Sequence, residues 1–352
     1  MRDDKYWEYA SVNTIIMGEK IVLNYEKELE SLYTSLSSDL EKELSFIFSK
    51  YNKNGKILYS DLRTRLDNST YKKFKSQLKT IYNELEENMF TKDIIQEAKK
   101  LYDRKTATVL EYIQFMSNYY IDMLATNNAK EIYNTMQDIY LASYYVYFYN
   151  FINGVQKDIE FVPVHSQDMQ NSLKSKWFDG TRNSTYMERV DTSRLQSVSN
   201  ITDMIPRYIA MGYTLDRCVS EIDKYINKRQ NYDRAIVRTT ADYTSNQAIF
   251  SVLDAVELDS YVYIAVLDNR TTEQCRSLDG TVYKLLQAVV GVNLPPLHYH
   301  CRSTIGPHFS TSDKNRFNKL DSISRRNTLN TWLDKVLKVE HADIRRVIQV
   351  YF

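Results

Sequence analysis

Two cysteines and two histidines late in the chain are the residues whose types could bind a metal ion or carry out catalysis. Cys275, His298, His300 and Cys301 fall within residues 267–303 of a 352-residue chain that has only 3 cysteines and 5 histidines. Thiolate and imidazole groups together suit zinc, so we take these four side chains as the predicted ligands of a zinc site, with an aspartate as the alternative to His300. The spacing is looser than in a zinc finger, because one cysteine stands alone and the H-x-x-C group follows far downstream.

Two other interpretations of the same residues stay open. Cys275 beside His298 would make a nucleophile and base pair, with Asp268 orienting the imidazole. Alternatively, the cysteines are small buried residues and the histidines bond to the backbone. The sequence patterns of phosphate-binding loops, nucleophile elbows and zinc proteases do not occur in the chain. We therefore expect a protein that is not an enzyme.

A strand, a hairpin and a stiff segment are expected to position these side chains. Residues 260–268 alternate as a strand does, and the turn signal at Asp279 and Gly280 leads into a second strand that can pair with the first. Pro295 and Pro296 stiffen the chain just before the histidines. The sequence thus predicts that the hairpin and the stiff segment bring the cysteines and histidines together.

The order of these residues resembles the C-terminal domain of phage minor head proteins, the Mu F-like head-morphogenesis family. The resemblance covers about residues 170–307 and rests on D-x-R-T, C-x-x-L-D-G and P-P-x-H-x-x-C-R in that order. Besides the cysteines and histidines, the residues that carry it are Asp268, Arg270, Thr271, Leu278, Asp279, Gly280, Pro295, Pro296 and Arg302, with Arg238, Thr239 and Asn246 upstream. The family commonly has H-P-x-C and ends in C-R-C, whereas this chain has Tyr299 and Ser303 at those positions. His300, which the usual pattern lacks, is then the candidate for the missing ligand.

The resemblance implies a low-copy virion protein, located in the phage head interior and, during assembly, in the host cytoplasm. Its expected partners are the portal protein and capsid or scaffold proteins of the procapsid, and DNA during packaging or ejection, with no small-molecule substrate. Two alternatives stay open: an effector- or toxin-type enzyme, such as a nuclease or nucleotide transferase, and a DNA-binding module.

For the DNA-binding alternative, a basic, tyrosine-containing segment offers a contact surface. Its candidate contacts are Lys224, Lys228, Arg229 and Arg234. The chain as a whole is balanced, with 46 basic and 45 acidic residues, and this predicts no general affinity for nucleic acid or anionic membranes.

The rest of the chain predicts an α+β fold that is mostly helical. No proline precedes Pro163, and apolar residues recur at helical spacing throughout that half. The expected helices cover residues 9–51, 68–88, 92–127, 129–151, 215–228, 233–253 and 325–337. The expected domains are a helical N-terminal domain at 1–160, the mixed head-morphogenesis domain with a short sheet at 161–310, and a helical tail at 311–352. The longest apolar run is too short to span a bilayer, so no membrane anchor is expected.

Overall fold

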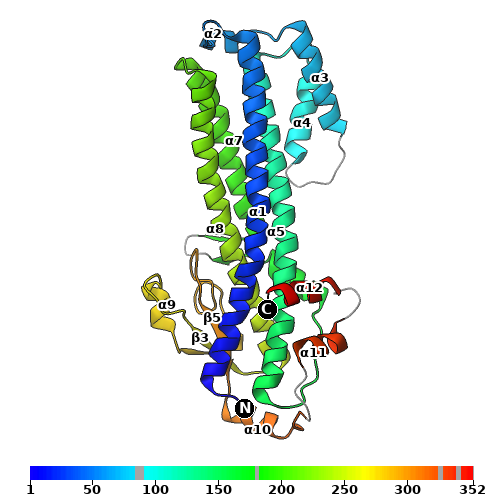
Figure 1. The fold of residues 1–352 in the computed structure, drawn as a ribbon, viewed down its shortest axis with the longest axis vertical. Helices are drawn as coiled ribbons and strands as arrows, with labels where there is room; N and C mark the ends of the chain where they lie inside the picture. The colour runs from blue at the N-terminus through cyan, green and yellow to red at the C-terminus, as the bar shows by residue number, and fades with distance from the viewer. Residues whose placement is uncertain (84–90, 179–181, 324–327, 338–341, 352) are drawn as a thin grey trace. The chain divides into compact units, whose positions relative to one another are not determined.

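The computed structural model describes residues 1–83, 91–178, 182–323, 328–337 and 342–351. It is mostly helical with small antiparallel sheets, which confirms the predicted fold class (Figure 1). Its helices are α1 (Asp4–Tyr51), α2 (Tyr59–Leu62), α3 (Asn68–Asn83), α4 (Thr91–Tyr102), α5 (Val109–Val155), α6 (Ser166–Lys174), α7 (Tyr186–Ala210), α8 (Leu215–Ala255), α9 (Glu273–Leu278), α10 (Thr311–Asn318), α11 (Leu329–Val336) and α12 (Ala342–Tyr351), with a 3-10 turn η1 (Leu285–Gln287). Within these described ranges, no helix combines the length and the apolar character that crossing a membrane requires.

Two helix boundaries differ from those expected from the sequence. The predicted break near residue 128 does not occur, because α5 continues through it; the chain turns at residues 103–108 instead. The Thr108 backbone N–H donates to Glu111 Oε2 at 2.7 Å, and the Glu111 N–H donates to Thr108 Oγ1 at 3.2 Å. This reciprocal cap starts α5 and satisfies two backbone donors at its N-terminus. The predicted helices at 215–228 and 233–253 are likewise one helix, α8.

The chain forms two compact units, and each is discontinuous in sequence. Unit 1 contains Met1–Tyr25, Ile132–Tyr186 and Ala235–Phe352, and unit 2 contains Glu26–Glu131 and Met187–Arg234. The boundaries of the units fall inside or at the ends of long helices rather than in linkers. The sequential division expected from the sequence is different, since its boundaries near residues 160 and 310 both lie within unit 1.

The core of unit 1 is rich in aromatic residues. Tyr144, Tyr145 and Phe148 lie on one face of α5 and are buried. Phe161 stacks on Tyr145 with ring centroids 5.4 Å apart, and Trp332 of α11 meets Phe161 edge to face at 5.3 Å. Offset and edge-to-face contacts of this kind add to the stabilisation that burial provides. The aromatic row of α5 is therefore packed core.

A three-stranded antiparallel sheet in unit 1 positions the candidate site. Its order is β4 (Val282–Lys284), β3 (Ser260–Ile264) and β5 (Thr304–His308); a separate two-residue pair, β1 (Trp177–Phe178) and β2 (Asn183–Ser184), lies elsewhere in the same unit. The predicted strand and its predicted partner are β3 and β4, with Tyr261 opposite Tyr283. Sequence analysis missed β5, because Gly306 and Pro307 are poor strand residues. A Cβ atom on Gly306 would lie 2.9 Å from Ile264 Cδ1, so a larger residue there would require the Ile264 side chain to shift.

Unit 2 buries carboxylates among its helices. Asp233 Oδ2 accepts hydrogen bonds from the Tyr33 hydroxyl at 2.8 Å and from Asn128 Nδ2 at 3.2 Å. Asp122 forms an ion pair with Arg194 at 3.0 Å. Burial raises the pKa of Asp122 from 3.8 to about 6, and this outweighs the opposite effect of the Arg194 guanidinium.

We expect Asp122→Asn to become more stable relative to the wild type as pH rises. A carboxyl whose folded pKa lies above its unfolded value contributes fully to stability below about pH 3.8, and this contribution is lost as pH rises through about 6. Urea-unfolding free energies of both proteins at pH 4, 5, 6 and 7 measure the effect. Asp191→Asn is the control, since its more exposed carboxylate contacts the same Arg194. A difference between wild type and Asp122→Asn that stays constant with pH contradicts this account.

Candidate metal centre

Three of the four predicted ligands lie together in unit 1. Cys275 Sγ is 3.7 Å from Cys301 Sγ and 3.2 Å from His298 Nε2, and the three ligating atoms all lie within 4.8 Å of one another. Tetrahedral zinc, with Zn–S of about 2.3 Å and Zn–N of about 2.0 Å, separates two sulfurs by roughly 3.8 Å and sulfur from nitrogen by roughly 3.5 Å. The observed distances are close to these values, so both the donor types and their spacing fit zinc.

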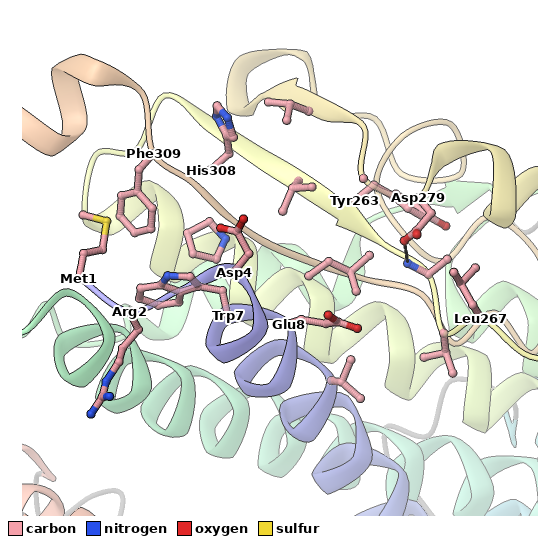
Figure 2. A pocket seen from close by; sticks show the side chains of 18 of the residues that line it. Met1, Arg2, Asp4, Trp7, Glu8, Tyr263, Leu267, Asp279, His308 and Phe309 are labelled. Carbon is pink, nitrogen blue, oxygen red and sulfur yellow. Dashed lines mark hydrogen bonds between the residues drawn. The ribbon is translucent and has the colours of Figure 1, made fainter.

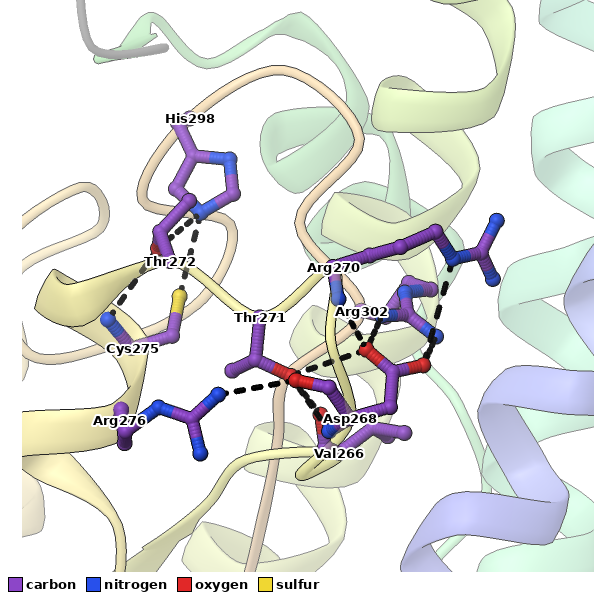
Figure 3. Close-up of polar contacts among 9 residues, drawn as sticks. All are labelled: Val266, Asp268, Arg270, Thr271, Thr272, Cys275, Arg276, His298 and Arg302. Atoms are coloured by element: carbon purple, nitrogen blue, oxygen red, sulfur yellow. Dashed lines mark hydrogen bonds and ion pairs between the residues drawn. The ribbon is translucent and has the colours of Figure 1, made fainter.

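Cys275 is positioned by the first turn of α9. Thr272 is the N-cap of this helix, and its hydroxyl oxygen accepts a hydrogen bond from the Cys275 backbone N–H at 3.3 Å (Figure 3). The Tyr263 hydroxyl, from β3, donates to Cys275 Sγ at 3.4 Å. The thiol is thus held from two sides, by the helix cap and by the sheet, and it is 2% exposed.

His298 and Cys301 are positioned by a turn. The Cys301 N–H donates to the His298 carbonyl at 3.2 Å, and His298 Nδ1 lies 2.8 Å from the Tyr299 carbonyl. With Nδ1 donating to this carbonyl, Nε2 faces Thr272 and Cys275, and a hydrogen on it can donate to the Cys275 thiolate, which raises the pKa of His298. Without that hydrogen, the ring is neutral and its Nε2 presents a lone pair. This is the tautomer in which a histidine binds a metal through Nε2 while its other nitrogen is fixed by the backbone.

The two thiols differ in their preference for ionisation. Hydrogen bonding from the Cys301 thiol, and next from His298, holds the pKa of Cys275 below its usual range despite burial. The same bond to Cys275, together with burial, raises the pKa of Cys301 well above its usual range. The metal-free cluster therefore favours a thiolate on Cys275 that shares the proton of Cys301.

Ser303, rather than His300, faces the three ligands. Ser303 is 2% exposed, and its hydroxyl lowers the pKa of both Cys275 and Tyr263. His300 is exposed, has a φ of 59°, and is not part of the group of ligating side chains. The position that lacks the family's usual cysteine thus still points into the cluster, with a hydroxyl in place of a thiol.

An arginine–carboxylate pair fixes the segments on either side of the cluster. Arg302 Nη1 and Nη2 donate to the two oxygens of Asp268 at 2.7 and 2.6 Å, and the Arg270 N–H donates to Asp268 Oδ1 at 2.8 Å (Figure 3). These bonds, led by that of Arg302, hold the pKa of Asp268 well below its usual range. Thr271 accepts the Asp268 N–H at 2.9 Å, and Arg276 donates to the Asp268 carbonyl at 2.9 Å. Asp268 therefore pairs with arginine, and it does not orient His298 as a Cys–His dyad would need.

Other residues of the resemblance tie the cluster segment to α8. Thr239 Oγ1 accepts the His300 backbone N–H at 3.1 Å, and Asn246 Nδ2 donates to the Ser303 carbonyl at 3.2 Å. Both contacts are made to backbone atoms of this segment and not to a metal-ligating side chain. They fix the path of the segment that carries Cys301.

The turn after α9 contains two further residues of the predicted motif. Asp279 Oδ1 accepts the Ala265 N–H at 2.8 Å. This bond forms just past the end of β3, beyond the residues that pair with β4. Gly280 has a φ of 72°, a conformation that glycine adopts without steric cost. The bond between Pro295 and Pro296 is cis, and both residues are buried. Like the other motif residues, these four shape the backbone around the cluster.

The basic residues predicted to contact nucleic acid lie on α8 in unit 2. Lys224 forms an ion pair with Glu221 at 2.7 Å, and Arg234 pairs with Glu30 at 3.6 Å. Arg229 donates to Gln196 at 3.0 Å and stacks over the ring of Tyr232. Lys228 is exposed. Three of the four are thus already engaged by side chains of the same unit.

A pocket of about 1090 Å³ in unit 1 was not foreseen from the sequence. It lies between the first turns of α1 and the sheet, with Trp7 and Phe309 at one end and Leu267 and Asp279 at the other (Figure 2). Its walls come from residues far apart in the chain, and no local sequence pattern reports such a juxtaposition. The ligating atoms of the cysteine–histidine cluster are not part of its lining.

Comparison with known families supports the resemblance inferred from the motifs. Residues 199–306 match the model of a family described as Phage Mu protein F like protein. The matched region contains every residue of the cluster and both partners of the arginine–carboxylate pair. No curated protein and no solved structure matches the chain significantly. The match shows that residues 199–306 are similar to this family, which suggests a phage-head-related protein.

Proposed function

We propose that this chain, with its Mu F-like region at residues 199–306, is a minor head protein that acts in phage head morphogenesis. It associates with the portal protein inside the procapsid, contacts capsid or scaffold proteins, and acts with the DNA during packaging or ejection. It is made in the host cytoplasm and remains in the virion. The family match over the region that carries the connected motif residues is the observation that supports this proposal.

The contacts of the motif residues favour a structural rather than an enzymatic role. Asp268, Arg302 and Asn246 all bond to the protein itself. Cys275 and Cys301 are 2% and 0% exposed, whereas a nucleophile needs access to a substrate. His298 Nδ1 faces a backbone carbonyl where a catalytic pair needs an orienting carboxylate.

Zinc is the cofactor that the cluster would hold, through Cys275, His298 and Cys301. A bound ion would link the first turn of α9 to the segment that precedes β5. The ion would take the place of the proton that the two thiols share. It would also replace the Thr272 hydroxyl as the partner of His298 Nε2. Its contribution would be to the stability of this small mixed region, which has few apolar residues of its own around the cluster.

We expect the protein to co-purify with procapsids and full heads of its source phage at a low copy number. Quantitative mass spectrometry of gradient-purified particles measures this, and cross-linking identifies the neighbouring proteins. Procapsids assembled without the portal protein are the control, and they should lack the chain. Finding the chain only among free proteins of the lysate would contradict the proposed function.

A further inference from the structure

Helix α3 of unit 2 has an exposed face that is basic and free of acidic residues. The helix contains four lysines and no aspartate or glutamate. It buries Thr70, Phe74, Leu78 and Ile81 and packs beside α4. The exposed residues are Asn68, Ser69, Lys72, Lys73, Ser76, Lys79, Thr80 and Asn83. All of these side chains can donate hydrogen bonds, and three of them are cationic.

No carboxylate among the residues that the structure describes forms an ion pair with the lysines of α3. Lys73 lies 4.8 Å from the ring centroid of Phe46, and Lys75 lies 4.7 Å from that of Tyr102. An ordinary solvated helix face carries charges of both signs that pair at i, i+3 or i, i+4, as Lys224 and Glu221 do on α8. The face of α3 instead carries charges of one sign.

The segment that leads into α3 extends the positive charge. Residues 50–83 contain nine basic and two acidic residues, a net charge of +7 in a chain whose net charge is +1. The two acidic residues are already occupied: Asp67 Oδ1 accepts the Ser69 and Thr70 backbone N–H groups at 2.9 Å, and Asp61 lies 3.5 Å from Lys53. The balanced composition of the whole chain therefore conceals a strongly basic local surface.

We propose that the exposed face of α3 binds the phosphate backbone of double-stranded DNA without sequence preference. Lys72 and Lys79 are two turns apart, or about 10 Å along the helix, and a duplex carries one charge per about 1.7 Å of its axis. Several phosphates thus lie within reach of the lysines, and the hydroxyl and amide groups between them are typical phosphate donors. An anionic membrane fits less well, because an interfacial helix inserts an apolar face and α3 buries its own in unit 2.

This DNA contact rests on the proposed head function, because it names the surface through which the chain would act with the DNA, and it can be tested on the purified chain alone. It also differs in place from the segment expected from the sequence, whose residues Lys224, Arg229 and Arg234 are engaged by protein groups. The result of the DNA-binding test is therefore independent of the result of the head-localisation test.

Fluorescence anisotropy with a labelled 30-base-pair duplex, at 25 to 200 mM NaCl, tests the proposal. We expect Lys72→Ala/Lys73→Ala/Lys79→Ala to weaken binding at least about 10-fold at 100 mM NaCl, and to reduce the slope of log K against log salt by about 2.7, or 0.9 per lysine. The matched control removes three exposed lysines elsewhere in unit 2. It is the triple variant Lys27→Ala, Lys42→Ala and Lys130→Ala, which should stay within about 2-fold of the wild type.

A second variant separates loss of charge from loss of folding. Lys72→Arg/Lys73→Arg/Lys79→Arg keeps the charge and should retain the wild-type slope, and far-ultraviolet circular dichroism checks that every variant is helical. The proposal is overturned if the wild type does not bind the duplex at 25 mM NaCl, or if the control triple loses as much affinity as the α3 triple. Binding to phosphatidylserine vesicles without binding to the duplex would also overturn it.

Discussion

Purified protein is expected to contain about one zinc ion per chain, and Cys301→Ser is expected to remove it. Cys301 is fully buried and supplies one of three ligands, so its hydroxyl replacement leaves two ligands and an unfilled position. Zinc present at about 1,000 times its Kd stabilises the folded state by about 4 kcal/mol, and this contribution disappears with the site. The free energy of unfolding should therefore fall by about that amount in the variant, and by a similar amount when the wild type is treated with EDTA.

Elemental analysis and urea unfolding, each with and without EDTA, measure these effects. Cys218→Ser is the matched control, because Cys218 is equally buried but lies on α8 in unit 2. It should lose stability from burying a hydroxyl and still contain zinc. Wild-type protein that contains no zinc after purification from zinc-supplemented medium would rule out the metal centre, as would equal zinc content in both variants.

The cluster could be predicted from sequence because it is nearly local. Cys275, His298 and Cys301 are rare residue types within 27 positions, and a hairpin with a stiff segment is enough to bring them together. The sequence does not show which arginine pairs with Asp268, since Arg270 and Arg302 both flank the segment. Only the folded backbone shows that Arg302 makes the bidentate contact, while Arg270 contributes its N–H.

The fourth side chain could not be predicted, because it depends on local backbone direction. Imidazole is the better ligand, so the sequence favoured His300. The chain runs into β5 from Cys301, and residues two apart on an extended segment share a side. Cys301 and Ser303 are both buried, whereas His300 is exposed and has a positive φ. A single hydroxyl residue gives no signal that would distinguish it from an ordinary surface serine.

Helical periodicity gave the fold class but not the organisation of the units. Asn127 and Asn128 looked like a break, yet Asn128 is buried and donates to Asp233 of a distant helix. The turn before α5 does have a readable signal, the T-x-x-E cap of Thr108 and Glu111. Periodicity reports which face of a helix is buried and not what covers it. Long helices that contribute to two compact units are therefore predicted, from the sequence, to form one helical domain.

Ser303→Cys is expected to raise zinc affinity by roughly 100-fold. The Ser303 hydroxyl already lowers the pKa of Cys275, so a thiolate at the same position would complete a set of three cysteines and one histidine. Structural zinc sites with four protein ligands bind with about 10–16 kcal/mol, or roughly 3 kcal/mol per ligand, which corresponds to about 100-fold. Competition with a chromophoric chelator measures the affinity, and cobalt substitution gives a sulfur-to-metal absorption band that should grow with the third thiolate.

His300→Ala tests whether the fourth position of the metal centre belongs to Ser303, as the structure indicates, or to His300, as the sequence suggested. The ring of His300 is exposed and is not part of the ligand group, so its removal should leave zinc affinity within about 2-fold of the wild type. Its backbone N–H, which donates to Thr239, is unaffected by the change. If His300→Ala instead lowers the affinity as far as Cys301→Ser does, while Ser303→Cys has no effect, then His300 is the fourth ligand. The segment must then turn His300 inward when the metal binds, since in the metal-free arrangement Ser303 is the residue that faces Cys275.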